Sequence, residues 1–115
     1  MAYSVEYYET PNGTFPAEKF ILIQDTKMKA KIFRNLELLE EMGPALRKPI
    51  SEYLGDDILE LRTQVGNNAT RILYFFFIGN RVILTNGFVK KTQKTPTAEL
   101  ELAKKYKQDF IKHKG

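Results

Sequence analysis

The chain has 115 residues, 43% apolar and 28% charged, so we expect one compact domain over residues 1–115. It has no cysteine and one histidine, which excludes disulfides and thiol catalysis and leaves too few ligands for a zinc site, so no metal or other cofactor is expected. The longest apolar run, Ile72 to Ile78, is too short to span a membrane, and with no visible signal peptide we expect a cytoplasmic protein without a membrane partner.

The first predicted elements in chain order are one strand and two helices. β-Prone residues predict a strand over Tyr3–Tyr8, and the turn residues that follow end it. A proline in the first turn favours a helix that begins at Pro16. A second helix is predicted over 26–42, where apolar residues recur every three or four positions, and Gly43 suits its C-terminal cap. We expect these two helices to form a hairpin against a sheet.

A loop, three strands and a final helix complete the pattern. We interpret residues 46–57 as a loop. The last helix is predicted to begin near Pro96, with Thr95 as its N-cap and with acids early and lysines late. Short turn sequences separate the strands and imply antiparallel neighbours. The order β-α-α-β-β-β-α predicts an α+β domain in which helices cover one face of an antiparallel sheet. The three predicted strands are 58–65, 70–78 and 81–89.

Positive charge is concentrated in the second half of the chain. From Ile58 to Lys94 there are six cations and one acid, Glu60, so this segment carries +5, against +4 for the whole chain. Such a surface attracts polyanions, although solubilising charge on strand faces explains the pattern equally well. The six cations are Arg62, Arg71, Arg81, Lys90, Lys91 and Lys94.

The alternation of side chains along a strand sorts the arginines by face. Glu60 and Arg62 share one face of their strand. Arg71 lies in a strand that is apolar on both sides, which we therefore expect at the centre of the sheet. Because an arginine is rarely buried without a partner, we expect Arg71 at a sheet edge or cleft, with a salt bridge to Glu60 as the alternative.

Three lysines follow the last strand, and a solvated loop is the simplest explanation for them. If the strand continues, Lys90 and Lys91 lie on opposite faces, so only one of them is expected at a site. The alternation does not choose between them, and Lys94 lies farther along the loop.

Five other residues have structural or functional explanations. Phe88 is either a core side chain or a platform on which a base stacks. Asn86 suits a turn, and Tyr74 and Tyr106 are expected in the core with their hydroxyls at its rim. His113 lies in the last turn of the final helix, where we do not expect a catalytic role.

The second half of the chain resembles the HigB-like, phage-associated branch of the RelE/ParE toxin superfamily. The resemblance covers Ile58 to about Lys105, roughly two-fifths of the chain. Before this segment only the order of elements and the helical hairpin agree. The matching motifs are Glu60-Leu61-Arg62, Arg71 to Phe75, Phe88 to Lys91 and Thr92 to Pro96.

This resemblance implies a toxin of a type II toxin–antitoxin pair with the compact RelE-like, microbial-RNase-like fold. It implies a ribosome-dependent mRNA endoribonuclease, whose partners are the ribosome, mRNA and a HigA-like helix-turn-helix antitoxin. Operator DNA would be bound only through the antitoxin complex. Two alternatives stay open, because a fold does not determine an activity: a ParE-like inhibitor of DNA gyrase and a nucleic-acid-binding module without catalysis.

Cations alone can support RNA cleavage. The 2′-OH attacks the phosphate, the transition state gains negative charge, and fixed arginines and lysines stabilise it. We assign Arg71 to clamp the scissile phosphate and Arg62 to support it, whereas Glu60 either balances charge or acts as a base. Lys90, Lys91 and Lys94 are candidates for transition-state stabilisation, and one of them for proton transfer. The candidates for RNA binding are Arg81, Phe88 and Lys94.

Overall fold

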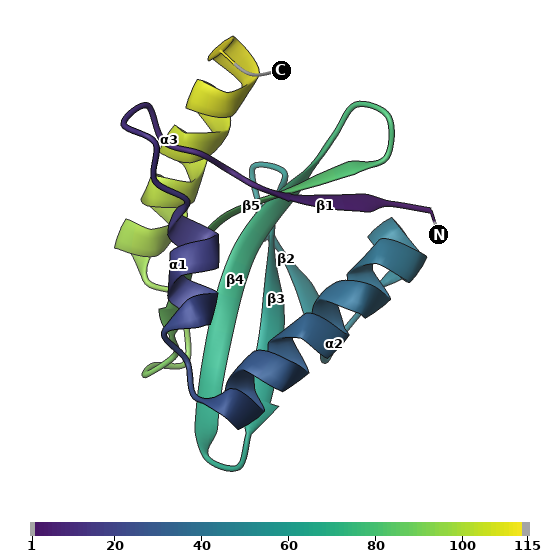
Figure 1. The fold of residues 1–115 in the computed structure, drawn as a ribbon, viewed down its shortest axis with the longest axis vertical. Coiled ribbons are helices and arrows are strands. Elements are labelled where there is room, and N and C mark those ends of the chain that lie inside the picture. Colours follow the sequence, from purple (N-terminus) through teal and green to yellow (C-terminus); the bar gives the residue numbers. More distant parts are fainter. Residues whose placement is uncertain (1, 114–115) are drawn as a thin grey trace.

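A computed structural model describes residues 2–113 of the chain, with three helices, one short 3-10 turn and one sheet (Figure 1). Among these residues, no helix is both long and apolar enough to cross a membrane. The elements are β1 (Ser4–Tyr7), α1 (Pro16–Leu22), α2 (Thr26–Met42), η1 (Gly43–Ala45), β2 (Ser51–Gly55), β3 (Ile58–Val65), β4 (Asn68–Phe77), β5 (Arg81–Val89) and α3 (Thr97–His113). The predicted α+β fold is confirmed.

The sheet has five strands in the order β1-β5-β4-β3-β2, with β4 at its centre as predicted. The prediction of a wholly antiparallel sheet is wrong for one pair, because β1 runs parallel to β5. A parallel neighbour needs a long crossover, and α1, α2 and the hairpin strands all lie between these two strands in the chain.

The predicted loop over 46–57 contains an additional edge strand, β2, so this prediction is wrong. β2 pairs with β3 through a two-residue turn, in which Asp56 and Asp57 both have positive φ, at 54° and 60°. Hairpin turns of this kind need positive φ at both central positions and usually contain asparagine or glycine. Two aspartates in succession therefore gave little indication of a hairpin.

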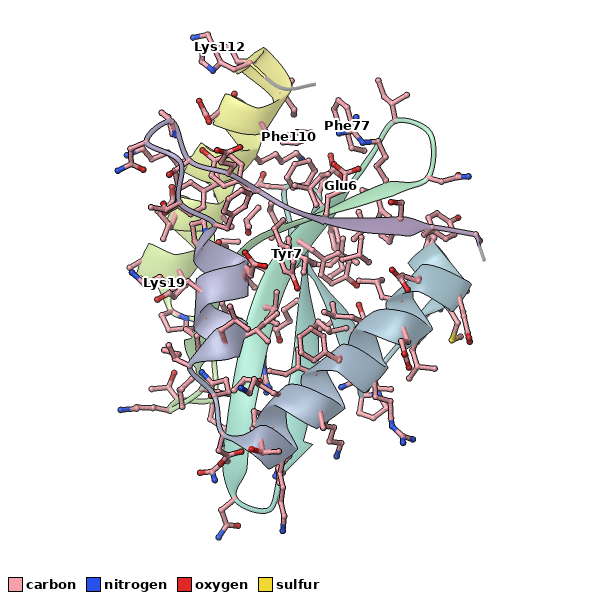
Figure 2. The ribbon with its side chains drawn as sticks, viewed as in Figure 1. Glu6, Tyr7, Lys19, Phe77, Phe110 and Lys112 are labelled. Atoms are coloured by element: carbon pink, nitrogen blue, oxygen red, sulfur yellow. The ribbon has the colours of Figure 1, made fainter. Side chains whose placement is uncertain are left out.

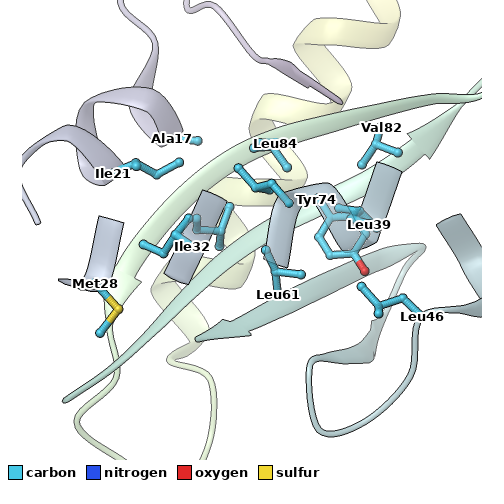
Figure 3. Packing of buried hydrophobic residues seen from close by; sticks show 12 residues of the cluster. Ala17, Ile21, Met28, Ile32, Leu39, Leu46, Leu61, Tyr74, Val82 and Leu84 are labelled. Atoms are coloured by element: carbon cyan, nitrogen blue, oxygen red, sulfur yellow. The ribbon is translucent and has the colours of Figure 1, made fainter. Parts of the chain in front are cut away.

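Helices cover both faces of the sheet, so the prediction of one covered face is also wrong. α1 and α2 pack on one face, where Ile21, Ile32 and Leu39 meet Leu61 and Tyr74 of the strands (Figure 3). The side chains on the other face of β4 are apolar as well, so a second element must pack on that face to exclude water.

α3 covers this second face. Ala103 and Phe110 of α3 pack against Leu73 and Phe75 of β4 and against Ile83 of β5. The strands between the two helical layers are therefore largely buried, and the partly exposed arginines Arg62 and Arg81 lie at opposite ends of the sheet. These ends are where a binding site can form.

Candidate functional site

Glu60 of β3 is the centre of a cluster of charges on the α3 face. The residue is only 2% exposed. Its Oε2 lies 2.9 Å from Nε of Arg62 and 3.5 Å from Nε of Arg71, and its Oε1 accepts a 2.7 Å hydrogen bond from the hydroxyl of Thr95. A buried carboxylate needs such partners, so Glu60 draws two strands and the loop after β5 together. Because both of its oxygens accept hydrogen bonds, charge balance explains Glu60 better than a base role.

Arg62 is held between two carboxylates. Its Nε donates to Glu60, and its Nη2 donates to Glu52 of the unpredicted strand β2. The side chain keeps 30% of its surface exposed. β2 therefore contributes to the site, because Glu52 fixes the guanidinium of Arg62 from the outer edge of the sheet.

Arg71 lies near the start of β4, the central strand of the sheet, and is only 8% exposed. The prediction that Arg71 lies at a sheet edge or cleft is only partly correct. Arg71 lines a groove, but it is also buried beside Glu60, with which it forms the ion pair that we gave as the alternative. Its Nη1 donates to the carbonyl oxygen of Thr70 at 3.0 Å, whereas its buried Nε makes no hydrogen bond. Its Nη2 has no hydrogen-bond partner among residues 2–113. Burial lowers the pKa of Arg71 and Glu60 opposes this shift, and an arginine stays charged throughout.

A β-bulge in β5 changes the face that the end of this strand presents. Ile72 and Tyr74 are two residues apart in β4, whereas their partners Gly87 and Leu84 are three residues apart in β5. The extra residue of β5 is a bulge. Side chains beyond it therefore lie on the opposite face from the one that unbroken alternation predicts.

The bulge brings Lys90 to the face of the arginines. Phe88 lies opposite Arg71, and the N–H of Lys90 donates to the carbonyl oxygen of Ala69, so the pairing continues to Lys90. Alternation then places Lys90 on the face of Arg71 and Lys91 on the other face. Without the extra residue, the two lysines would exchange places.

The three lysines of the loop after β5 carry charges without ion pairs in the described part of the chain. Lys90 is partly buried, and Lys91 and Lys94 are exposed. Within residues 2–113, none of the three forms an ion pair. Arg62 and Arg71 balance Glu52 and Glu60 in charge, so the surplus positive charge comes from the lysine loop together with Lys48, which also pairs with Glu52, and Lys31 of the groove.

A groove of about 440 Å³ opens beside the two arginines at the edge of β3. The ladder between β2 and β3 ends at Leu61, and beyond it the main chain of Arg62 bonds to Ile50 and to the side chain of Asn35 in α2. There α2 approaches, and Nζ of Lys31 donates to the carbonyl oxygen of Gln64 at 2.6 Å. The groove lining consists of Lys31, Asn35, Pro49, Ile50, Arg62, Gln64 and Arg71.

Comparison with known proteins gives one family. Residues 19–108 match the family described as phage derived protein Gp49-like (DUF891), which is more than half of the chain. The chain belongs to the Gp49-like family. This family belongs to the RelE/HigB-like toxin superfamily, and it is associated with RelE-like toxins that are endoribonucleases. None of the curated proteins compared with the chain matches it.

Several residues singled out in the Gp49-like sequence lie away from the cluster. Arg81 is at the opposite end of the α3 face, near Glu6, Phe77 and Phe110 (Figure 2). Phe88 is buried in the core under α3, so its ring is not available to stack on a base. Three further residues also lie away from the cluster. His113 bonds to Asp109 at the far end of α3, the ring of Tyr106 stacks on that of Tyr8, and the hydroxyl of Tyr74 bonds to Ser51.

Three residues of the site escaped the sequence analysis. Glu52 lies in the strand that was interpreted as a loop. Thr95 does not cap α3, which begins at Thr97, and bonds to Glu60 instead. Gln64 follows Arg62 on the same face of β3, and the alternation that placed Arg62 could have placed Gln64 too.

Proposed function

We propose that this Gp49-like chain is the toxin of a type II toxin–antitoxin pair, a ribosome-dependent mRNA endoribonuclease of the HigB-like branch, neutralised by a HigA-like antitoxin. The observation that carries the proposal is the gathering of Arg62 and Arg71 around Glu60, beside the unpaired lysine loop. The site is a cationic surface with its geometry fixed in advance, as stabilisation of a charged transition state requires.

In the proposed reaction, the 2′-OH of one nucleotide attacks the adjacent phosphate, and the P–O bond to the 5′-oxygen breaks. The free Nη2 donor of Arg71 and the ammonium of Lys90 bind phosphate oxygens as their charge grows. Arg62, Glu52 and Glu60 act as positioning residues, because each engages another member of the cluster.

Proton transfer falls to the lysine loop in this proposal. The single histidine lies at the far end of α3, and Glu60 accepts hydrogen bonds from Arg62 and Thr95. Lys90 and Lys94 carry ammonium groups that have no ion-pair partner among the described residues, whereas Nζ of Lys31 in the groove donates to the carbonyl oxygen of Gln64. A neutral amine of one lysine can accept the proton of the 2′-OH, and an ammonium can protonate the 5′-oxygen as it leaves.

One observation favours a second function, RNA binding without cleavage. The site contains no histidine, and both oxygens of Glu60 accept hydrogen bonds, so no free group well suited to acid–base chemistry lies among the described residues of the cluster. A cationic surface of this kind binds the phosphate backbone through counterion release, which predicts strong weakening by salt.

The experiment adds purified protein to a translating extract and maps cut sites in the mRNA by primer extension. We expect cuts that require ribosomes and that disappear in a Lys90→Ala/Lys94→Ala variant. A Lys105→Ala variant, altered at an exposed lysine of α3, serves as control and should cut normally. Salt-sensitive RNA binding without cuts would support the binding module instead. Intact mRNA together with inhibited gyrase supercoiling would support a ParE-like activity.

A further inference from the structure

The charges of α2 oppose its own dipole. The first half of the helix contains three lysines and the second half three glutamates. Asp25 caps the N-terminus by accepting a hydrogen bond from the N–H of Met28, but the first turn contains no acid and the last turn contains no base. The helix dipole favours the reverse arrangement, and like charges four residues apart, such as Lys27 with Lys31 and Glu37 with Glu41, repel each other. Helix stability therefore does not explain the three glutamates near the C-terminus, which makes a binding role the better explanation for them.

The acidic half of α2 borders an apolar groove of about 390 Å³. Val5 and Tyr7 of β1 and Leu36 of α2 form its floor, and Phe33 of α2 remains 42% exposed beside them. Figure 2 shows Tyr7 below β1, in the space between α1 and α2. An aromatic ring left exposed over an apolar floor indicates a contact surface.

Acids surround this groove on two sides. Glu37 and Glu40 of α2 line it, and within the described chain neither forms an ion pair. From the side of α1, Glu18 acts on Tyr7, whose pKa is raised by burial and by this negative charge. A groove with an acidic rim on a protein of net charge +4 repels phosphate and attracts cations.

We propose that this groove binds an amphipathic helix of a partner protein, with apolar anchors on one face flanked by lysine or arginine. The apolar side chains would lie over Tyr7, Leu36 and Phe33, and the basic flanks would meet Glu37 and Glu40. A partner strand added to the edge of the sheet beside β1 fits less well. β1 has only four residues, and because it already pairs with β5, few of its main-chain groups face outward. The groove lies on the face opposite Lys90, so this inference does not rest on RNA cleavage.

The test uses a labelled, acetylated and amidated peptide of about fifteen residues, a length at which helices begin to form, with leucines at helical spacing flanked by lysines. A matched peptide carries glutamates in place of the lysines. We expect fluorescence anisotropy to detect binding of the lysine peptide alone, weakening with salt. Amide chemical shifts should change around Val5, Tyr7 and Phe33.

The variant Glu37→Lys/Glu40→Lys should weaken the lysine peptide at least about tenfold, since both rim charges are reversed. Glu101→Lys, which changes an exposed acid on α3, is the matched control and should bind normally. mRNA cleavage by the double variant should equal that of the wild type, which separates this test from that of the proposed function.

Three results would overturn the proposal. Equal binding of the lysine and glutamate peptides would show that charge does not determine binding. Amide chemical-shift changes confined to other surfaces would show that the peptide does not bind in this groove. A dimer in light scattering that Phe33→Ser converts to a monomer would assign the groove to a second copy of the chain. Phe33 is exposed, so the fold is expected to tolerate this substitution.

Discussion

Two arginine–glutamate pairs occupy opposite ends of the same face of the sheet and differ in what they leave free. Arg81 donates to Glu6 from Nε at 2.6 Å and from Nη2 at 2.9 Å. Its guanidinium also lies 5.2 Å from the ring centroid of Phe77 and 5.4 Å from that of Phe110. The carboxylate of Glu6 thus binds the guanidinium of Arg81 at two nitrogens, and two aromatic rings pack against it. We conclude that this pair stabilises its end of the sheet.

Arg71 is paired less completely. It shares Glu60 with Arg62, makes its hydrogen bond to a main-chain carbonyl, and lies on the face to which the bulge turns Lys90. This difference leads to the hypothesis that a cation on this fold binds RNA where its carboxylate leaves donors unused and where ammonium groups without ion pairs share the same face. The predictions below test this difference.

The largest expected effect is that of Arg71→Ala on stability. Removing one member of a buried ion pair leaves the other unpaired, and because Glu60 keeps Arg62 and Thr95, we expect a loss of about 3 kcal/mol, the low end of such cases. Urea denaturation of the variant measures it. In a double-mutant cycle with Glu60→Gln, the two losses should not add, and simple additivity would contradict the coupling.

The next effect is on catalysis. Lys90→Ala should lower the rate of ribosome-dependent cleavage by about 10²–10³, the cost of removing one donor to a charged transition state. Because the side chain makes no ion pair within the described residues, its urea midpoint should stay at the wild-type value. Quantified primer extension gives the rate, and a proportional loss of folded protein would contradict a role in the reaction.

A smaller effect is expected from Thr95→Val, which removes the hydrogen bond between the loop and Glu60. Hydrogen bonds to charged groups contribute about 1.5–3 kcal/mol, and we expect the low end because Thr95 is only partly buried. Thermal unfolding measures this loss. Thr95→Ser keeps the hydroxyl and should behave like the wild type, whereas equal losses in both variants would show that the methyl group matters instead.

The smallest effect on activity is expected from Arg81→Ala. The pair with Glu6 lies at the far end of the sheet, so cleavage should continue at the wild-type rate while the melting temperature falls modestly. If folded Arg81→Ala protein had a cleavage defect as large as that of Lys90→Ala, the two ends of the sheet would not differ in function as we propose.

Much of the fold was predictable because its signals are local. The apolar periodicity of α2 and the apolar run of β4 determine one helix and the central strand, and alternation placed Glu60 and Arg62 on one face. β2 was missed because its turn uses Asp56 and Asp57 at positive φ. The parallel pairing of β1 was missed because nothing local in Ser4–Tyr7 specifies a partner that lies far along the chain.

The site was predictable only in part, because its assembly depends on contacts between distant segments. Sequence spacing could not show that Thr95 crosses to Glu60 or that Glu52 reaches Arg62. The choice between Lys90 and Lys91 depends on the bulge, which unbroken alternation does not predict.

The most direct test of the central claim compares Lys90→Ala with Lys91→Ala in the translating extract. Both substitutions remove one ammonium group from adjacent positions, so the net charge of the protein changes equally. The proposed site predicts that Lys90→Ala loses cleavage while Lys91→Ala keeps most of it, because the bulge places only Lys90 on the face of Arg71. The reverse order, or equal losses in both variants, would contradict this account of the site.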